Sequence, residues 1–180
     1  MPKISEADVA WVGRLHAAVD ELAAPLVAQH REKLACKAGC ADCCVDNLTV
    51  FRIEAARIEA AHPELLAEAQ PHPEGACAFL DGEGRCRVYE VRPYVCRTQG
   101  LPLRWLEEDE DEEIIESRDV CPKNFVGQPL EALEADAMWS LGPFEQRLAD
   151  KQHEIDGGER VALRDLFSHE PDRRHLPVVR

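Results

Sequence analysis

Four cysteines lie within one nine-residue segment, Cys36-Lys-Ala-Gly-Cys40-Ala-Asp-Cys43-Cys44. Thiolates are the softest ligands that a protein offers, so a short loop with several of them suits zinc, copper(I) or an iron–sulfur cluster. Adjacent cysteines rarely meet the geometry of a disulfide, so Cys43 and Cys44 are not expected to bond to each other. We therefore expect the chemistry of this chain to start from this loop.

Four further cysteines follow the loop. The complete set is Cys36, Cys40, Cys43, Cys44, Cys77, Cys86, Cys96 and Cys121. None falls on the apolar stripe of a predicted helix, which argues against a role as small buried hydrophobes. No signal peptide is recognisable, and no uncharged run reaches the roughly 18 residues of a membrane helix. We expect a cytoplasmic protein whose reduced thiols are metal ligands or redox groups rather than a disulfide framework.

Two kinds of metal centre fit the spacing. Zinc is usually held by two Cys-x2-Cys pairs; only Cys40 and Cys43 form one, although Cys77 and Cys86 could supply the other half. An iron–sulfur cluster accepts a wrapped loop plus one distant cysteine, and Cys36-x3-Cys40-x2-Cys43 fits that arrangement. Eight thiols could form two sites of four, or one site and a redox pair. We favour an iron–sulfur cluster over zinc.

Support for an enzyme is weak. The same spacing occurs in radical S-adenosylmethionine enzymes, but there a β-strand precedes the loop, whereas here a helix is predicted. The chain has no HExxH sequence, Ser/His/Asp grouping or glycine-rich phosphate loop. His30, His62 and His72 could be alternative ligands, but surface or core positions suit them better. We therefore lean toward a binding protein.

Two helices are predicted around the cysteine loop. Segment 5–33 begins with Ser5, typical of an N-cap, and apolar residues recur behind it at helical spacing. Pro25 should kink this helix or split it near Ala23. An apolar stripe predicts a second helix over Leu48–Ala61. The cysteine loop should therefore connect two helices.

The only β structure that we expect is a hairpin within the cysteine-rich part. Its strands are 77–80 and 85–89, and a glycine-rich turn connects them. Alternation would place one thiol of each strand beside an apolar neighbour. Arg92-Pro93 should then begin a short helical turn that carries Cys96.

The remainder is predicted to be helical, with an apolar stripe from Leu130 to Leu148 that Gly142-Pro143 interrupts, and a last amphipathic piece over 159–167. The fold class is therefore mainly α, with a small, irregular, cysteine-lined core and one β-hairpin.

We expect a single domain over residues 1–170. It would comprise a cysteine core, 36–121, between helical flanks, 5–33 and 128–167. Residues 171–180 would form a flexible tail.

The charge limits the partners. The chain has 35 acidic and 21 basic residues and a formal net charge of −14, which disfavours nucleic acid and anionic membranes. Eight of the ten residues in 107–116 are acidic. This stretch is predicted to be a solvated loop or helix face, or alternatively a docking strip for a protein partner.

In order and spacing, four motif elements resemble the YkgJ-type cysteine-cluster family of zinc- or iron-chelating domains over residues 36–121. The elements are Cys36-x3-Cys40-x2-Cys43-Cys44, Cys77-Ala-Phe-Leu80, Gly84-Arg85-Cys86-Arg87-Val88-Tyr89 and Arg92-Pro93-Tyr94-Val95-Cys96-Arg97. The resemblance implies metal binding through these cysteines. The family includes a protein needed for flagellin lysine methylation, but the flanks of this chain match nothing in it.

Three functions follow as hypotheses. The first is a metal-binding protein, the second a cluster-dependent redox or methyl-transfer enzyme, and the third an interaction protein with a purely structural zinc. In each of them Arg92 and Arg97 could offset the charge of the thiolates near Cys96, or anchor Glu54 or Glu90.

Overall fold

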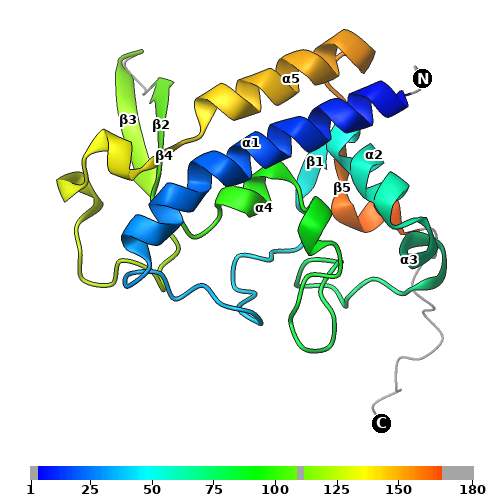
Figure 1. The fold of residues 1–180 in the computed structure, drawn as a ribbon, viewed down its shortest axis with the longest axis horizontal. Coiled ribbons are helices and arrows are strands. Elements are labelled where there is room, and N and C mark those ends of the chain that lie inside the picture. Colours follow the sequence, from blue (N-terminus) through cyan, green and yellow to red (C-terminus); the bar gives the residue numbers. More distant parts are fainter. Residues whose placement is uncertain (1–3, 109–111, 168–180) are drawn as a thin grey trace.

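The computed structural model describes residues 4–108 and 112–167 (Figure 1). Its helices are α1 (Glu6–His30), α2 (Arg52–Ala61), α3 (Pro63–Glu68), α4 (Tyr94–Thr98) and α5 (Gly142–Asp156). Its strands are β1 (Thr49–Phe51), β2 (Leu103–Glu108), β3 (Ile114–Asp119), β4 (Trp139–Ser140) and β5 (Arg160–Ala162). Of these described residues 46% are helical and 14% lie in strands, forming two small sheets. The expectation of a mainly α fold is therefore wrong, and the fold is mixed α/β.

Helix α1 begins where the sequence predicted. Ser5 and Asp8 form a reciprocal capping box, in which Ser5 Oγ accepts the Asp8 N–H at 3.2 Å. The predicted split at Pro25 is wrong, because the helix continues to His30. The turn beyond the proline is held by packing of Leu26 and by His30, whose Nε2 lies 2.7 Å from the Ala137 carbonyl oxygen.

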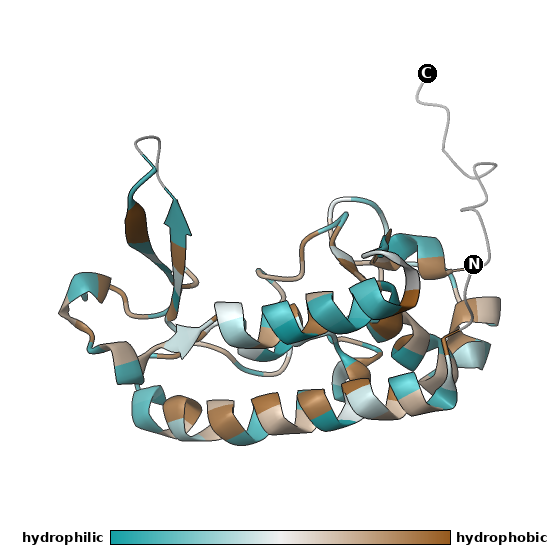
Figure 2. Ribbon diagram, turned by 90° about the horizontal axis from the view of Figure 1, so that it is seen from above, coloured by the Kyte–Doolittle hydropathy of each residue, from teal (hydrophilic) through white to brown (hydrophobic). Residues whose placement is uncertain are grey.

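Helices α1 and α5 run alongside each other and cover one side of the first hydrophobic cluster (Figures 1 and 2). Tyr94 and Trp139 lie in this cluster; Trp139 Nε1 donates to the Tyr94 hydroxyl at 3.0 Å. The ring of Phe144 stacks on Trp139 at a centroid distance of 5.5 Å. The short helix α4, which begins at Tyr94, is therefore fixed to α5 through aromatic side chains.

The predicted helical stretches beside the cysteine core contain strands instead. Strand β1 occupies the predicted start of the second helix and pairs antiparallel with β5, with Val50 opposite Val161. Trp139 in β4 pairs in parallel with Leu103 in β2, and the segment before it forms only short 3-10 turns. Gly142-Pro143 starts α5 rather than interrupting a helix, since proline is well tolerated in the first turn.

The hairpin expected over 77–89 is reduced to one isolated bridge, Leu80 to Cys86. The Asp81 carboxylate accepts the backbone N–H groups of Glu83 and Arg85, each at 2.8 Å, and so closes a tight loop rather than a regular ladder. The regular hairpin is β2–β3, which includes described parts of the acidic stretch 107–116. The prediction of a loop or helix face there is therefore wrong.

A second hydrophobic cluster lies under the cysteine segments, where Phe79 and Phe167 approach with ring centroids 5.0 Å apart. It also contains Val50, Ala55, Ile58, Leu66, Ala78, Val88 and Leu163. Among the described residues, no helix combines the length and apolar character needed to cross a membrane. The expected tail 171–180 lies outside the described residues.

Candidate metal centre

The segment between α1 and β1 holds its thiols in two consecutive tight turns. The Cys40 N–H donates to the Lys37 carbonyl at 3.0 Å, and the Cys44 N–H donates to the Ala41 carbonyl at 2.9 Å. Gly39 is the third residue of the first turn and has φ +83°, a conformation that glycine adopts without strain. The turns therefore fix Cys40, Cys43 and Cys44 in a segment that has neither a helix nor a strand.

Five thiols form one electrostatically coupled group, which we call the five-thiol group. Its members are Cys43, Cys44, Cys77, Cys86 and Cys96. A hydrogen bond between the Cys43 and Cys44 side chains raises the pKa of Cys44 and lowers that of Cys43. Burial, reinforced by neighbouring Cys77 and Cys86, raises the pKa of Cys96 to about 12. Each thiolate therefore disfavours another unless a cation is present.

Backbone contacts hold the segments of this group together. The Cys77 N–H donates to the Cys44 carbonyl at 2.9 Å, and the Arg87 N–H donates to the Phe79 carbonyl at 2.9 Å. Burial is also the main cause that raises the pKa of both Cys77 and Cys86. The thiols of Cys77 and Cys86 therefore lie in a partly desolvated environment.

The other three cysteines, Cys36, Cys40 and Cys121, adjoin the segment 121–125, and we call them the three-thiol group. Asn124 Nδ2 lies 3.4 Å from Cys36 Sγ, and it donates to the Gly100 carbonyl at 2.6 Å. The hydrogen bond to Asp42 raises the pKa of Lys123, and the nearby Cys40 and Cys121 thiolates raise it further. The loop 36–44 therefore contributes thiols to both groups.

The geometry is not that of a closed site for one metal ion. All eight cysteines are free thiols, which suits a soft metal. Within residues 4–108 and 112–167, no three His, Cys, Asp or Glu side chains are placed to hold a metal ion. The donor set therefore fits zinc or iron, while the thiols are not gathered around a single point.

A buried polar network positions Cys96. Glu54 on α2 is 4% exposed, and its Oε1 accepts the Tyr94 N–H at 2.7 Å, two residues before Cys96. His16 on α1 contacts the same oxygen at 3.0 Å. Since α4 has only five residues, it depends on such contacts for its position.

The two arginines of the Arg-Pro turn have different partners from those expected. Buried Arg97 forms an ion pair with Asp20 and donates to the carbonyls of Arg92 and Glu90, each at 2.9 Å. It therefore anchors to α1 and to the backbone, not to the side chains of Glu54 or Glu90. The predicted electrostatic role fits Arg92, whose charge lowers the pKa of Cys86.

Arg164 contributes to the site from outside the cysteine core, and no sequence pattern indicated this role. Its guanidinium pairs with Asp46 at 2.7 Å and donates to the carbonyls of His72 and Ala76 at 2.7 and 2.9 Å. Burial raises the pKa of Cys77, and the charge of Arg164 partly offsets this rise. Pairing of β5 with β1 brings this arginine to the cysteine segments. Sequence patterns did not indicate Asn124 or Gly100 either, because the contacts among Asn124, Gly100 and Cys36 are long-range.

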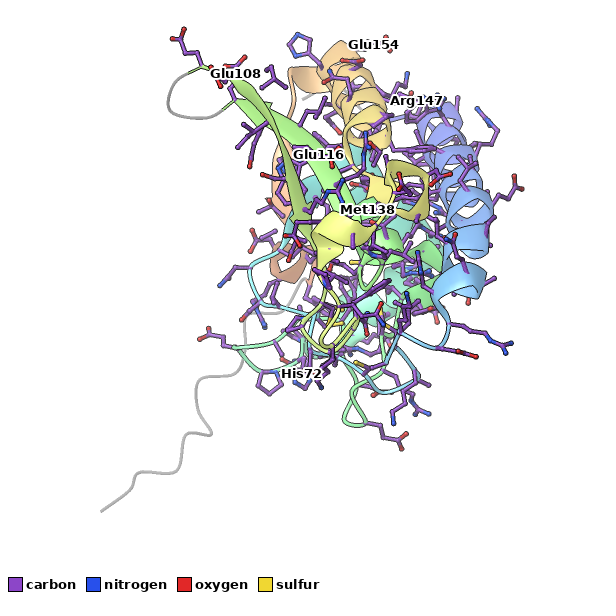
Figure 3. All side chains as sticks on the ribbon, turned by 90° about the vertical axis from the view of Figure 1, so that its left-hand side faces the viewer. His72, Glu108, Glu116, Met138, Arg147 and Glu154 are labelled. Carbon is purple, nitrogen blue, oxygen red and sulfur yellow. The ribbon has the colours of Figure 1, made fainter. Side chains whose placement is uncertain are left out.

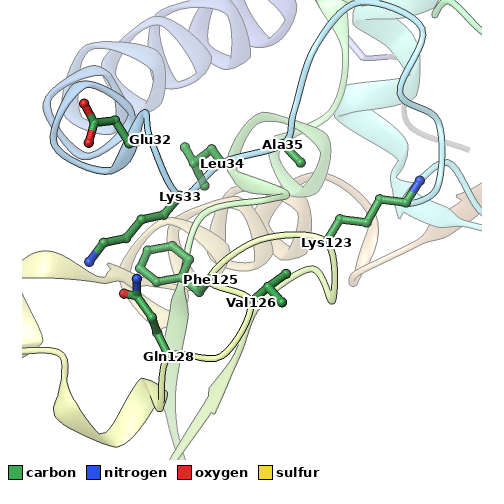
Figure 4. A pocket seen from close by; sticks show the side chains of 8 residues that line it. All are labelled: Glu32, Lys33, Leu34, Ala35, Lys123, Phe125, Val126 and Gln128. Carbon is green, nitrogen blue, oxygen red and sulfur yellow. The ribbon is translucent and has the colours of Figure 1, made fainter.

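A shallow pocket adjoins the three-thiol group (Figure 4). Leu34, Ala35 and Phe125 line it, together with the charged residues Glu32, Lys33 and Lys123. Val126, also in the lining, is 77% exposed. The pocket is therefore an open depression whose lining carries both signs of charge.

His30, which was a less favoured ligand, packs edge-on against Phe125 in the core instead, with ring centroids 4.9 Å apart.

Residues 35–122 match a family model named CxxCxxCC and described as a putative zinc- or iron-chelating domain. The match contains all eight cysteines and confirms the family to which the motifs pointed. It leaves out α1 and α5. No curated protein and no solved structure matches the chain.

Proposed function

Because residues 35–122 belong to the CxxCxxCC family of zinc- or iron-chelating domains, we propose that this chain is a metal-binding protein whose main centre is the five-thiol group. The single observation that carries the proposal is that backbone contacts join the segments of these thiols across distant parts of the sequence: the Cys77 N–H donates to the Cys44 carbonyl at 2.9 Å, and Leu80 pairs with Cys86. A bound cation removes the mutual repulsion of the thiolates. It also compensates for their desolvation.

The metal that we propose is an iron–sulfur cluster, bound by cysteine thiolates. A cluster has its open coordination positions on separate irons, so its ligands lie farther apart than the ligands of one ion. This requirement agrees with thiols that influence one another but do not surround a single point. When bound, a cluster would supply one-electron chemistry or a rigid cross-link between the cysteine segments.

The surrounding residues would tune such a centre. Burial raises the pKa of Cys77 and Cys86; Arg87 and Arg92 near Cys86, and Arg164 near Cys77, partly offset that rise. They thereby favour the thiolate form that binds metal. We propose that the protein works in the cytoplasm, where these thiols stay reduced.

The test is anaerobic purification followed by iron, acid-labile sulfide and zinc analysis with a visible spectrum. We expect brown protein with about four irons and four sulfides per chain. A Cys77→Ser/Cys86→Ser variant should lose this absorption, whereas Cys36→Ser, in the three-thiol group, should keep it. Colourless protein with about one zinc per four thiolates would replace the cluster with zinc. Folded wild-type protein that binds neither metal would refute the proposal.

A further inference from the structure

The hairpin β2–β3 projects from the body of the molecule (Figures 1 and 2). It carries large apolar side chains that are exposed. Leu106 is 65% exposed, Ile114 64% and Ile115 40%. Leu106 and Ile114 lie on the same face, because Leu106 is opposite Glu116 and Ile114 is opposite Glu108. Exposed apolar residues that share a strand surface indicate an interaction site more strongly than isolated ones.

One edge of this hairpin has no strand partner. The strand order is β3-β2-β4, so β3 is an edge strand among the described residues. Alternate backbone N–H and C=O groups of an edge strand point outward and can pair with another chain. The exposed Ile114 and Ile115 lie on this strand. Among the described residues, the outer edge of β3 therefore combines backbone groups that pair with no further strand and exposed apolar side chains.

The base of the hairpin is firmly held. Glu116 pairs with Arg104 at 3.2 Å and with Arg118 at 2.6 Å, and Arg118 Nη1 also donates to the Leu130 and Leu133 carbonyls at 2.7 and 2.9 Å. On the other face, Glu107 accepts hydrogen bonds from Trp105 and Ser117. A strand fixed in this way loses little conformational freedom when a partner binds.

The charge of the hairpin decides which partner fits. Residues 105–117 contain no lysine or arginine, and Arg104 and Arg118 both pair with Glu116 in the described part of the hairpin. Figure 3 shows Glu108 near the end of the hairpin and Glu116 nearer its base. A second copy of the hairpin would set acidic side chains against each other, which disfavours self-association through this edge.

We propose that the outer edge of β3 binds an extended, basic segment of another protein as an added strand. Apolar side chains of that segment would cover Ile114 and its neighbours, and its lysines or arginines would face carboxylates such as Glu108 and Glu112. Backbone pairing supplies affinity, and the alternation of side chains supplies specificity. This proposal is independent of the metal centre.

The test uses the full chain and a synthetic peptide that alternates lysine with isoleucine. The peptide has roughly seven residues, which is a typical strand length. The control peptide carries an N-methyl group on its central residue, so its backbone cannot pair fully. Calorimetry measures binding, and hydrogen–deuterium exchange locates it. We expect the first peptide to bind, to slow exchange over 114–119, and to bind more tightly than the control.

A pair of charge-matched variants tests the location. Glu108→Lys/Glu112→Lys should weaken binding by roughly tenfold or more, because it reverses two charges at the edge. Glu64→Lys/Glu68→Lys makes the same change on exposed residues of α3 and should alter binding by less than about twofold. No binding, equal losses in both variants, or equal affinity for the N-methyl peptide would overturn the proposal. Sedimentation could also overturn the proposal. If the wild-type protein forms a dimer and the Glu108→Lys/Glu112→Lys variant is a monomer, the partner at this edge is a second copy of the chain.

Discussion

The carboxylate of Glu54 accepts the backbone N–H of Tyr94 at 2.7 Å, so a buried side chain of α2 fastens the first turn of the helix that carries Cys96. The same oxygen contacts His16, whose pKa burial lowers, and this contact links α1 to the arrangement. The position of one proposed metal ligand therefore depends on residues outside the cysteine segments.

Replacing Glu54 by alanine should destabilise the metal-free protein by about 2–4 kcal/mol, because a buried N–H and a buried histidine lose their partner. Denaturant unfolding measures this loss. Glu59→Ala is the matched control on the same helix, since its pair with Arg52 is partly exposed and should contribute no more than about 1 kcal/mol. In metal-loaded protein, Glu54→Ala should also speed the loss of metal to a chelator. Equal behaviour of the two variants would contradict the positioning role.

Gly100 should tolerate no side chain. It has φ +95°, and a Cβ there would lie 2.5 Å from Cys36 Sγ. Gly75 has a similar φ of +99° but open space around it. Gly75→Ala should therefore cost only the backbone strain, about 1–2 kcal/mol, whereas Gly100→Ala should cost a further 1–3 kcal/mol, roughly, from the clash.

Unfolding in denaturant compares these two glycine variants. Alkylation of Cys36, followed by mass spectrometry, reports whether its thiol has moved: the rate should change in Gly100→Ala and stay the same in Gly75→Ala. Identical stability and identical labelling would show that the close approach of Gly100 to Cys36 is unimportant.

Arg97 should not be replaceable by lysine. Its guanidinium donates to two carbonyls and pairs with Asp20, and the single ammonium of lysine cannot meet all three. Arg97→Lys should lower the free energy of unfolding by about 1–3 kcal/mol. Arg85→Lys, at an exposed pair with Asp81 and Glu83, should be nearly neutral. A neutral Arg97→Lys variant would exclude the network as a support for α4.

Metal uptake should strengthen as pH rises. The pKa values of Cys77, Cys86 and Cys96 are raised by burial, so these thiols are protonated in the metal-free protein at neutral pH. Each must release a proton to bind metal, which gives about a tenfold gain in apparent affinity per pH unit for each proton released. Titration of metal-free protein between pH 6 and 8 measures the slope. Cys96→Ser should reduce that slope, and an affinity independent of pH would contradict the assignment of these ligands.

The stability of metal-free protein should have the opposite pH dependence. A thiol whose pKa is raised in the folded state stabilises that state below its unfolded value of about 8.5, and this contribution is lost as pH rises toward the folded value. For Cys96 that value is about 12. Denaturant unfolding between pH 7 and 10 should show the loss above about pH 8.5. A loss reduced in Cys96→Ser would identify the group responsible.

Local sequence signals predicted the cysteine chemistry and the start of α1. The Ser5 cap and the apolar spacing behind it depend on neighbours along the chain, so they could be recognised. The strands could not, because β1 pairs with β5 and β2 with β4 across long separations. The buried Trp139 illustrates this: the helical spacing of Leu133, Ala137 and Leu141 around it concealed a strand that tertiary pairing with Leu103 stabilises.

The division of the eight cysteines was likewise beyond the sequence. Cys40 and Cys43 have the spacing of one metal-binding pair, yet their surroundings differ: Cys43 is hydrogen-bonded to the Cys44 side chain, whereas Cys40 lies near Lys123. That difference arises from turns and from distant residues such as Asn124 and Arg164. Sequence spacing therefore indicated candidate ligands, which stay a prediction, but not how the structure groups them.

X-ray absorption at the metal edge of anaerobically purified protein tests the central claim most directly, because it reports which atoms surround the metal. We predict iron surrounded by sulfur alone at about 2.3 Å, with short iron–iron contacts that disappear in Cys77→Ser/Cys86→Ser protein. Zinc with four sulfur neighbours would keep the metal centre but replace the cluster. A shell of oxygen and nitrogen atoms, or an unchanged spectrum in that variant, would contradict metal binding by the five-thiol group.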